Sequence, residues 1–429
     1  MHRATFLLFA ALLTASQALF AATELTYSGT VIQVERGREV PTKSFRLVAV
    51  VSNRTSFVIE EDGAGGWPWP NRYGQVSKKQ DIRLLHEHDG SRYPIPLPDP
   101  VFASPERLKA GASWQAGGKS FQVENTKTIN GRSCRQLRIT ADRGLVRTMM
   151  VDESNHQVVS VEQRFFMGRG DQFNLKMELD SQKQLSDDES LMTDNTLTAL
   201  LKLQSTLERS PDEQRPELTA KQVGMVNAQL SALEKLSAET SFADLVVAIR
   251  RDVKSQLKRQ TDVASLGKNL VGKSAPSFAL TALSGKVIPA KQYKGKPVIL
   301  HFWTYNGEKL EEPYGQVGYL DFLSNRRKES GVKVYGVAVD SRIVKNEGRP
   351  AAIRSIRKLR DFMNLSYDLT IDDGTLLDRF GDPRAVGAKL PLWVVISPDG
   401  KVAHYHAGFH TVERRTGLKA LDDVVSGLK

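Results

Sequence analysis

The spacing of apolar residues changes twice along this chain of 429 residues, and each pattern favours a different kind of fold. From about residue 25 to residue 181, short apolar and β-branched runs such as Tyr27–Val34 and Val158–Phe166 alternate with Gly, Asn and Asp. This pattern is typical of antiparallel strands, arranged as a barrel, a half-barrel or a sandwich. The sequence therefore predicts an antiparallel all-β domain over residues 23–185.

Residues 186–264 have the period of helices instead. Ser186 followed by Glu189 matches the capping box that opens many helices. Further on, apolar residues recur three or four positions apart, at Val223, Val226, Leu230 and Leu233. This spacing places side chains on one helix face. We expect a central α-helical hairpin of two or three helices, whose apolar stripe serves as core.

From about residue 268 to residue 429, strand-like and helical segments alternate. Val298–Trp303, Val332–Val339 and Leu392–Ser397 are apolar runs typical of buried strands, and helical patterns lie between them. The turn Ser397-Pro-Asp-Gly400 predicts a hairpin near the end of the chain. The order of elements favours an α/β thioredoxin-like fold over residues 268–429.

The first 22 residues have the features of a secretory signal peptide. Arg3 precedes the apolar run Phe6–Leu13, and Ser16 and Ala18 have the spacing of small residues that a signal peptidase accepts. The alternative is a structural N-terminal helix. We expect an exported protein that is periplasmic or secreted and soluble.

Several motifs in the last third of the chain resemble those of a known family. They are Gly272-Lys-Ser-Ala-Pro276, Gly336-Val-Ala-Val-Asp340 and Gly387-Ala-Lys-Leu-Pro391. In combination they resemble the thioredoxin-like redoxins, in particular the TlpA/ResA-like and AhpC/TSA-related branch. The resemblance covers about residues 268–429 and implies a thioredoxin-like fold there.

The family's catalytic motif is a pair of cysteines separated by two residues, directly after the segment that corresponds to Phe302-Trp303. This chain has one cysteine, Cys134, and an ungapped alignment puts Gly307 and Leu310 at the two positions. Neither residue can form a thiolate, which is the nucleophile of disulfide exchange. We therefore predict no catalytic residue and no cofactor, with Gly307 and Leu310 marking the missing cysteines.

The resemblance also implies a binding surface that needs no thiols. It makes Pro391 the family's cis-proline, and in family members the backbone before this proline can pair with an extended peptide. The predicted binding residues are Trp303, Tyr305, Leu390 and Pro391, and the predicted partner is a protein or extended peptide in the cell envelope. The alternative is that the proline only sets the geometry of its loop.

The net charge of +11 lies entirely in residues 251–429, which contain 30 basic and 19 acidic residues. Arg354, Arg357, Lys358 and Arg360 gather on one predicted helix. A basic surface can bind an anionic lipid or polysaccharide, or simply be solvated. Export argues against nucleic acid as a partner.

Histidines also gather in the last domain. His404 and His406 face the same side of a predicted strand, His410 follows closely, and His301 lies on another strand of the sheet. Imidazoles at this spacing can hold zinc or copper if a third ligand comes close. The alternative is that these histidines lie on a solvent-facing strand and bind no metal. We assign no metal and keep His404 and His406 as candidate ligands.

These observations leave three hypotheses. The first is an exported thioredoxin-like domain protein that has lost its redox cysteines and acts as a binding or scaffold protein in the cell envelope. The second is a redoxin-type thiol-disulfide oxidoreductase or antioxidant protein of the TlpA/AhpC class that works without its own cysteine pair. The third is a carrier of lipid or another apolar ligand through the β-domain. The missing thiols favour the first.

Overall fold

The computed structural model describes residues 22–61, 73–77, 81–89, 91–141, 144–207, 218–304, 316–344 and 348–428. The predicted signal peptide up to residue 21 and the positions Tyr305, Gly307 and Leu310 lie outside these residues. The chain divides into two compact units, of which one holds Met1–Pro211 and Gln229–Ile249 and the other Asp212–Ala228 and Arg250–Lys429.

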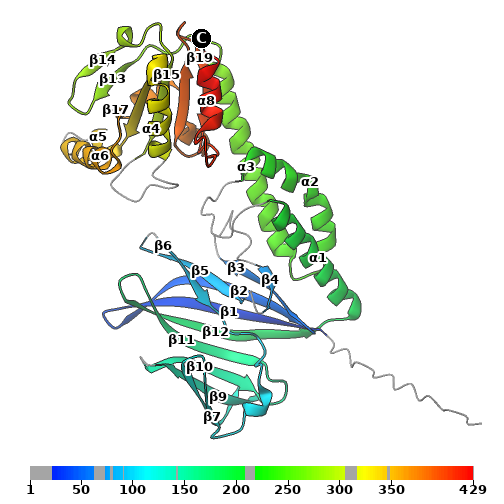
Figure 1. The fold of residues 1–429 in the computed structure, drawn as a ribbon. Helices are drawn as coiled ribbons and strands as arrows, with labels where there is room; N and C mark the ends of the chain where they lie inside the picture. Colours follow the sequence, from blue (N-terminus) through cyan, green and yellow to red (C-terminus); the bar gives the residue numbers. More distant parts are fainter. Residues whose placement is uncertain are drawn as a thin grey trace, which may run out of the picture. The chain divides into compact units, whose positions relative to one another are not determined.

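The first unit contains a ten-stranded antiparallel sheet, in which the first strand pairs with the last (Figure 1). Within the described residues the two edges of the sheet are β4 and β7, and β5 and β6 form a separate hairpin. The strands of the sheet are, in spatial order, β4 (Tyr73–Gln75), β3 (Thr55–Glu61), β2 (Arg38–Val51), β1 (Thr23–Glu35), β12 (Asp171–Gln184), β11 (Val158–Met167), β10 (Gly144–Asp152), β9 (Arg132–Ala141), β8 (Lys119–Ile129) and β7 (Ser113–Ala116). The hairpin consists of β5 (Arg83–His88) and β6 (Ser91–Pro96).

Strand β12 illustrates why these segments form a sheet with one buried face. Its apolar side chains Phe173, Leu175, Met177 and Leu179 are all buried. The residues between them are polar and at least partly exposed. Because successive side chains of a strand point to opposite faces, this alternation buries one face and leaves the other in water. The expected antiparallel β region is confirmed.

Three helices follow the sheet: α1 (Asp187–Thr206), α2 (Ala220–Ser237) and α3 (Ala243–Leu270). The capping box at the start of α1 is present, since Ser186 Oγ accepts from the Glu189 N–H and the Glu189 carboxylate accepts from the Ser186 N–H. Thr196 Oγ1 in α1 donates to the carbonyl of Leu236 in α2 over 3.0 Å. Helix α3 continues to Leu270, six residues beyond position 264, the predicted end of the helical segment.

The second unit contains a mixed seven-stranded sheet in the order β14-β13-β17-β16-β15-β18-β19. Strand β16 is parallel to both of its neighbours, and the remaining pairs are antiparallel. The strands are β13 (Ala279–Ala282), β14 (Val287–Pro289), β15 (Val298–Trp303), β16 (Lys333–Val339), β17 (Asp368–Asp372), β18 (Leu392–Ile396) and β19 (Val402–Ala407). The helices are α4 (Val317–Arg326), α5 (Ser341–Val344), α6 (Arg349–Met363), α7 (Thr375–Arg379) and α8 (Lys419–Ser426).

The seven-stranded sheet has a hydrophobic core on each face, since its central strands are buried on both sides. Ile299 and Val395 belong to one core, which includes side chains of α4, α6 and α8. Leu300 and Val394, one position along on the same strands, belong to the other, which includes side chains of β13 and α7. This layered arrangement, with helices against a mixed sheet, agrees with the thioredoxin-like fold expected for this region.

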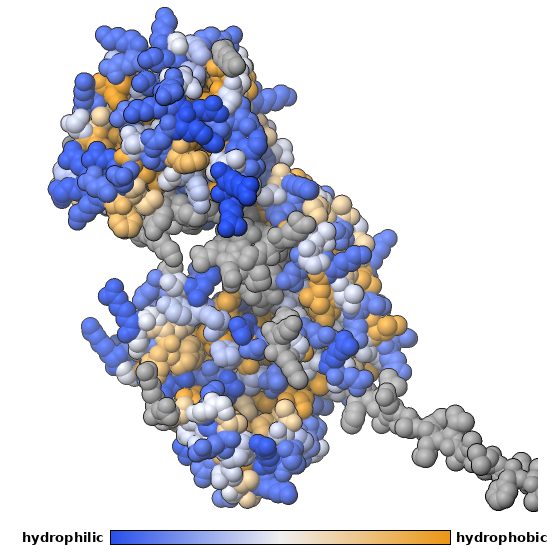
Figure 2. All heavy atoms as spheres, in the orientation of Figure 1, coloured by the Kyte–Doolittle hydropathy of each residue, from blue (hydrophilic) through white to orange (hydrophobic). Residues whose placement is uncertain are grey.

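Hydrophilic residues predominate on the face shown in Figure 2, with hydrophobic residues in small groups between them. Among the described residues, no helix combines the length and the apolar character that crossing a membrane requires.

The close packing of β16 generates a first prediction. A Cβ atom at Gly336 would lie 2.6 Å from Leu369 Cδ2 and 2.9 Å from Tyr367 Cε2. We expect Gly336→Ala to lower the free energy of unfolding by about 1–3 kcal/mol, because both neighbours must shift within a packed core.

The matched control is Gly224→Ala in α2, where a Cβ would meet no atom within 4 Å. There the substitution should stabilise the chain by about 0.5–1 kcal/mol, because alanine has the better helix propensity. Thermal unfolding of both variants tests the pair. An unchanged midpoint for Gly336→Ala would contradict the packing of β16 described above.

Candidate functional site

The candidate site lies where β15, the loop before β18 and the end of β19 meet. Trp303 is the last residue of β15 and is only 2% exposed, so its indole belongs to the core. Tyr305, Gly307 and Leu310 follow it in sequence, outside the described residues. The predicted part of Trp303 in binding stays a prediction.

The loop before β18 has a defined backbone. The Leu390–Pro391 peptide bond is cis, as the sequence resemblance implied. The buried Pro391 offers its carbonyl to the N–H of Gly408, over 2.7 Å. Within the described parts of the chain, the backbone N–H and C=O of Leu390 have no hydrogen-bond partner. Among the described residues, the half-buried Leu390 thus has one unpaired backbone N–H and one unpaired C=O.

A row of aromatic side chains crosses the sheet next to this loop. His301 on β15 is directly opposite Trp393 on β18, and Trp393 is opposite His406 on β19. The His301 and Trp393 rings stack with centroids 3.9 Å apart. The indole Nε1 of Trp393 donates to the carbonyl of Gly408 over 3.0 Å.

His404, His406 and His410 form a cluster at the end of this row. Their ring centroids are 6.2 Å apart for His404 and His406, 6.0 Å for His404 and His410, and 4.2 Å for His406 and His410. The structure thus brings together all the histidines that the sequence placed near one another. The contact between His410 and Trp393, at 5.2 Å between centroids, joins the cluster to the row.

The start of α4 is bound to this cluster through a buried amide. Gln316 precedes α4 in the left-handed conformation and is fully buried. Its Nε2 donates to the His410 carbonyl over 2.7 Å, and its Oε1 accepts from the His410 N–H over 3.0 Å. This two-point contact was not predicted, because a single glutamine carries no sequence signal of its partner.

Burial keeps these imidazoles neutral. It lowers the pKa of His301 to about 3. Burial, and after it the neighbouring imidazoles of His406 and His404, lowers the pKa of His410 to about 2. The pKa values of His404 and His406 are also lowered, mainly by burial. An uncharged imidazole keeps a lone pair on one ring nitrogen, which is the form that binds metals and accepts protons.

A more compact donor group lies in the first unit. His88, Asp89 and Asp171 place one ligand atom each within 4.8 Å of one another, the only such group of three among the described residues. His88 Nε2 already pairs with Asp171 Oδ2 at 2.7 Å, and both carboxylates are exposed. The contact of His88 with Asp171 is explained by a hydrogen bond near the surface, and no sequence motif indicated the group.

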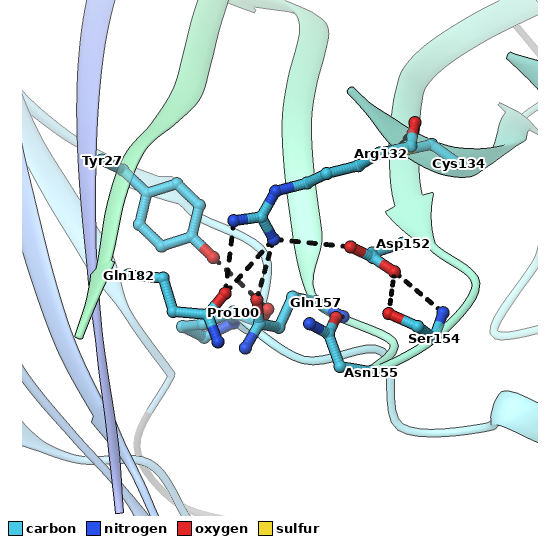
Figure 3. Close-up of polar contacts among 9 residues, drawn as sticks. All are labelled: Tyr27, Pro100, Arg132, Cys134, Asp152, Ser154, Asn155, Gln157 and Gln182. Carbon is cyan, nitrogen blue, oxygen red and sulfur yellow. Dashed lines mark hydrogen bonds and ion pairs between the residues drawn. The ribbon is translucent and has the colours of Figure 1, made fainter. Parts of the chain in front are cut away.

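The single thiol of the chain has a structural setting (Figure 3). Cys134 is buried, and its Sγ lies 3.6 Å from the carbonyl of Arg132. The Arg132 guanidinium binds Asp152 at 3.4 Å, Gln157 at 3.3 Å and Gln182 at 3.2 Å, which joins β9 to the turn after β10 and to β12. Burial, and after it the Asp152 carboxylate, raises the pKa of the thiol. These surroundings disfavour the reactive thiolate.

The predicted basic helix is α6. Arg354, Arg357 and Lys358 are exposed on it, and Arg360 is half-buried. Arg357 donates to the carbonyl of Leu283 over 2.7 Å, and Arg360 pairs with Asp361 at 3.1 Å. Part of this charge therefore has a structural use.

The neutral histidines generate a pH prediction. A histidine that is neutral when folded but has a pKa near 6.5 when unfolded stabilises the fold above that pH, and the stabilisation is lost as the pH falls towards the folded-state value. Between about pH 6.5 and 4.5, the unfolding free energy should fall by about 1.4 kcal/mol per pH unit for each such histidine. Urea unfolding in the presence of a chelator measures this slope.

His301→Phe keeps an aromatic ring against Trp393. It should reduce the pH dependence of the unfolding free energy by the contribution of one histidine, about 1.4 kcal/mol per pH unit. His156→Asn is the matched control, because asparagine also tolerates the left-handed backbone of this half-exposed position. An equal slope for His301→Phe and the parent chain would contradict the neutral, buried state of His301.

Comparisons with known proteins find similarity to the C-terminal part of the chain. Residues 271–405 match the model of the AhpC/TSA family. The thiol-disulfide oxidoreductase ResA of a Bacillus cereus strain is 32% identical over 150 residues, which cover 35% of this chain and 77% of ResA. The ResA of Geobacillus kaustophilus is 29% identical over 143 residues, covering 33% of this chain and 72% of the relative.

Among solved structures, a secreted Mycobacterium tuberculosis disulfide oxidoreductase homologous to E. coli DsbE is similar to part of the chain. It is 20% identical, and the match covers 35% of this chain and 96% of that chain with a TM-score of 0.27.

Proposed function

This chain belongs to the AhpC/TSA family through its C-terminal region, and we propose that it is an exported binding or scaffold protein of the cell envelope that has lost the redox cysteines of its relatives. In this proposal, the loop of Leu390 and Pro391 holds an extended segment of a partner protein. Export rests on the signal-like features of the first 22 residues.

The observation that carries the proposal is the unpaired backbone of Leu390. Within the described residues its N–H and C=O have no partner, while the next carbonyl, that of Pro391, is already bound by Gly408. Backbone groups that lie beside a sheet gain hydrogen bonds when an extended peptide aligns with them. Such binding needs main-chain groups and a rigid neighbour, and it needs no thiol.

The chemistry of the relatives' named activity argues for binding rather than catalysis here. Disulfide exchange requires a thiolate and a second thiol that resolves the mixed disulfide. Cys134 is the single cysteine in the sequence, is buried, and has a raised pKa. An oxidoreductase that works without its own cysteine pair is the alternative, and it would need a thiol from another molecule.

Two other partners are less well supported. An anionic lipid or polysaccharide could contact the exposed Arg354, Arg357 and Lys358 of α6. Carriage of an apolar ligand by the β-domain would need an apolar hollow, whereas two surface hollows of this unit are lined mainly by charged and polar side chains. The peptide is therefore the preferred ligand.

The absence of a thiol pair predicts that the purified chain does not accelerate the reduction of insulin by dithiothreitol. The rate should equal that of dithiothreitol alone, because no thiolate of the chain can enter the exchange. Cys134→Ser controls for the one thiol. Turnover that persists in this variant would contradict the proposed loss of activity.

Peptide binding is tested with reduced, carboxymethylated α-lactalbumin, an unfolded chain without free thiols. Leu390→Asp should weaken the binding of α-lactalbumin to the chain by at least about tenfold, equivalent to about 1.4 kcal/mol. The reason is that a carboxylate beside the unpaired backbone repels peptide carbonyls and stays solvated. Val287→Asp, at an exposed position of the edge strand β14, is the control and should bind as the parent chain does.

Salt distinguishes this interaction from one with the basic helix. Backbone pairing should change little between about 0.05 and 0.5 M salt, whereas contacts of exposed charges are screened over that range. Thermal unfolding of Leu390→Asp verifies that the variant is folded. If Leu390→Asp binds α-lactalbumin as tightly as the parent chain does, the peptide site loses its basis.

A further inference from the structure

The tip of the hairpin β5–β6 and the start of β12 bring three donor side chains together in the first unit. His88 is the last residue of β5, Asp89 follows it, and Asp171 opens β12, 83 positions further along the chain. One imidazole nitrogen and one carboxylate oxygen of each aspartate lie within 4.8 Å of one another. The fold thus assembles a donor set that the peptide proposal does not use.

The hydrogen bond between His88 and Asp171 leaves the position of Asp89 unexplained. His88 Nε2 lies 2.7 Å from Asp171 Oδ2 and 3.6 Å from Asp89 Oδ2. One ring nitrogen carries at most one proton, so it makes one short hydrogen bond, and two carboxylates this close to each other repel. A cation between the three side chains removes this repulsion.

The distances between the donor atoms suit a small ion. In a tetrahedral site with ion–ligand distances of about 2.0–2.2 Å, neighbouring ligand atoms are about 3.3–3.5 Å apart. The two distances from His88 Nε2, 2.7 and 3.6 Å, lie on either side of this range. Small rotations of the side chains therefore complete the site without a change in the backbone.

The surroundings leave room at the donor atoms and hold the imidazole in place. A Cβ at Gly168, in the turn before β12, would lie 3.0 Å from Asp89 Oδ2 and 3.1 Å from His88 Nε2, so any larger residue would crowd both ligands. The His88 ring packs edge-on against the buried Phe173, with centroids 5.0 Å apart. Its side chain is 14% exposed, whereas those of Asp89 and Asp171 are 58% and 46% exposed. The carboxylates thus face the solvent, which supplies the ion and a fourth, water ligand.

The chemistry of the donors indicates which ion. Two carboxylates carry two negative charges, which match a divalent cation. Calcium and magnesium prefer shells of oxygen atoms alone, whereas an imidazole nitrogen suits a transition ion. Zinc commonly binds three protein side chains and one water in a tetrahedron. We propose that His88, Asp89 and Asp171 bind one Zn(II) ion.

Zinc at this position has a structural consequence. The ion takes the place of the proton on His88 Nε2, and the neutral ring carries its proton on Nδ1 instead. Strands β5 and β6 pair with each other and not with the ten-stranded sheet, although Leu84 and Ile95 on them belong to the core of that sheet. The ion therefore ties the tip of the hairpin to β12. The site does not depend on peptide binding in the other unit.

The test uses the full chain without a histidine tag, after removal of metals with a chelator. Calorimetric titration with Zn(II) should show a site whose affinity falls at least about tenfold in Asp89→Asn and in Asp171→Asn, because each change removes a charged ligand of similar size. Asp180→Asn, at an exposed position of the same strand β12, is the control and should bind as the parent chain does. Equal affinity of Asp171→Asn and the parent chain would overturn the site.

X-ray absorption of the parent chain with one equivalent of Zn(II) keeps the proposal testable if the variants fail to fold. A shell of four nitrogen or oxygen atoms at about 2.0–2.1 Å, with scattering from one imidazole, supports the site. Scattering from three imidazoles would place the zinc at His404, His406 and His410 and would overturn the proposal.

Two further measurements address the ion and its effect. Titration with Ca(II) decides the class of ion, since binding as tight as that of Zn(II) would overturn the assignment to zinc. Zn(II) should also raise the thermal midpoint of the parent chain and leave that of Asp171→Asn unchanged, because an ion that binds only the folded state stabilises it. An equal rise in both chains would contradict the link between the hairpin and β12.

Discussion

The stack of His301 on Trp393 is the contact on which the candidate site depends. It joins the neighbouring strands β15 and β18, with both side chains fully buried. The Trp393 indole then fixes the carbonyl of Gly408, and the N–H of the same glycine fixes the carbonyl of Pro391. Gly408 thus links the aromatic row to the loop of Leu390 and Pro391. The position of the Leu390 backbone and that of the histidine cluster therefore both depend on the packing of His301 and Trp393.

The sequence contains one cysteine, Cys134, so the chain has no pair of thiols of its own. Thiol chemistry depends on the pKa and position of two particular side chains, and it ends when either is absent. Recognition of an extended segment depends on main-chain groups beside a sheet, which any sequence with the same backbone retains. In the proposed function, the backbone around Leu390 holds an extended segment without thiols, and Cys134, buried in the first unit, takes no part.

Much of the fold followed from local patterns. Alternating burial in β12, the capping box at Ser186 and Glu189, and the all-apolar strand β15 each have a physical cause within a few residues. The end of α3 was less predictable, because its last turns contain Gly267 and Asn269, which have low helix propensity, and its continuation to Leu270 depends on packing. Tyr405 illustrates this, since its ring would lie 3.0 Å from a Cβ at Gly267 and its hydroxyl donates to the Gly381 carbonyl.

The amino-acid sequence by itself determined the three patterned regions, the single cysteine, the excess of basic residues and the motifs shared with redoxins, because each is a local or compositional property. Only the tertiary structure decided which side chains meet. His301 and His410 are 109 positions apart, and Gln316 is 94 residues from its partner His410. Their assembly follows from strand order and register, which long-range burial sets. Burial in turn lowers the pKa values of both histidines, and it leaves both ring nitrogens of His301 and Nε2 of His410 without a hydrogen-bond partner among the described residues.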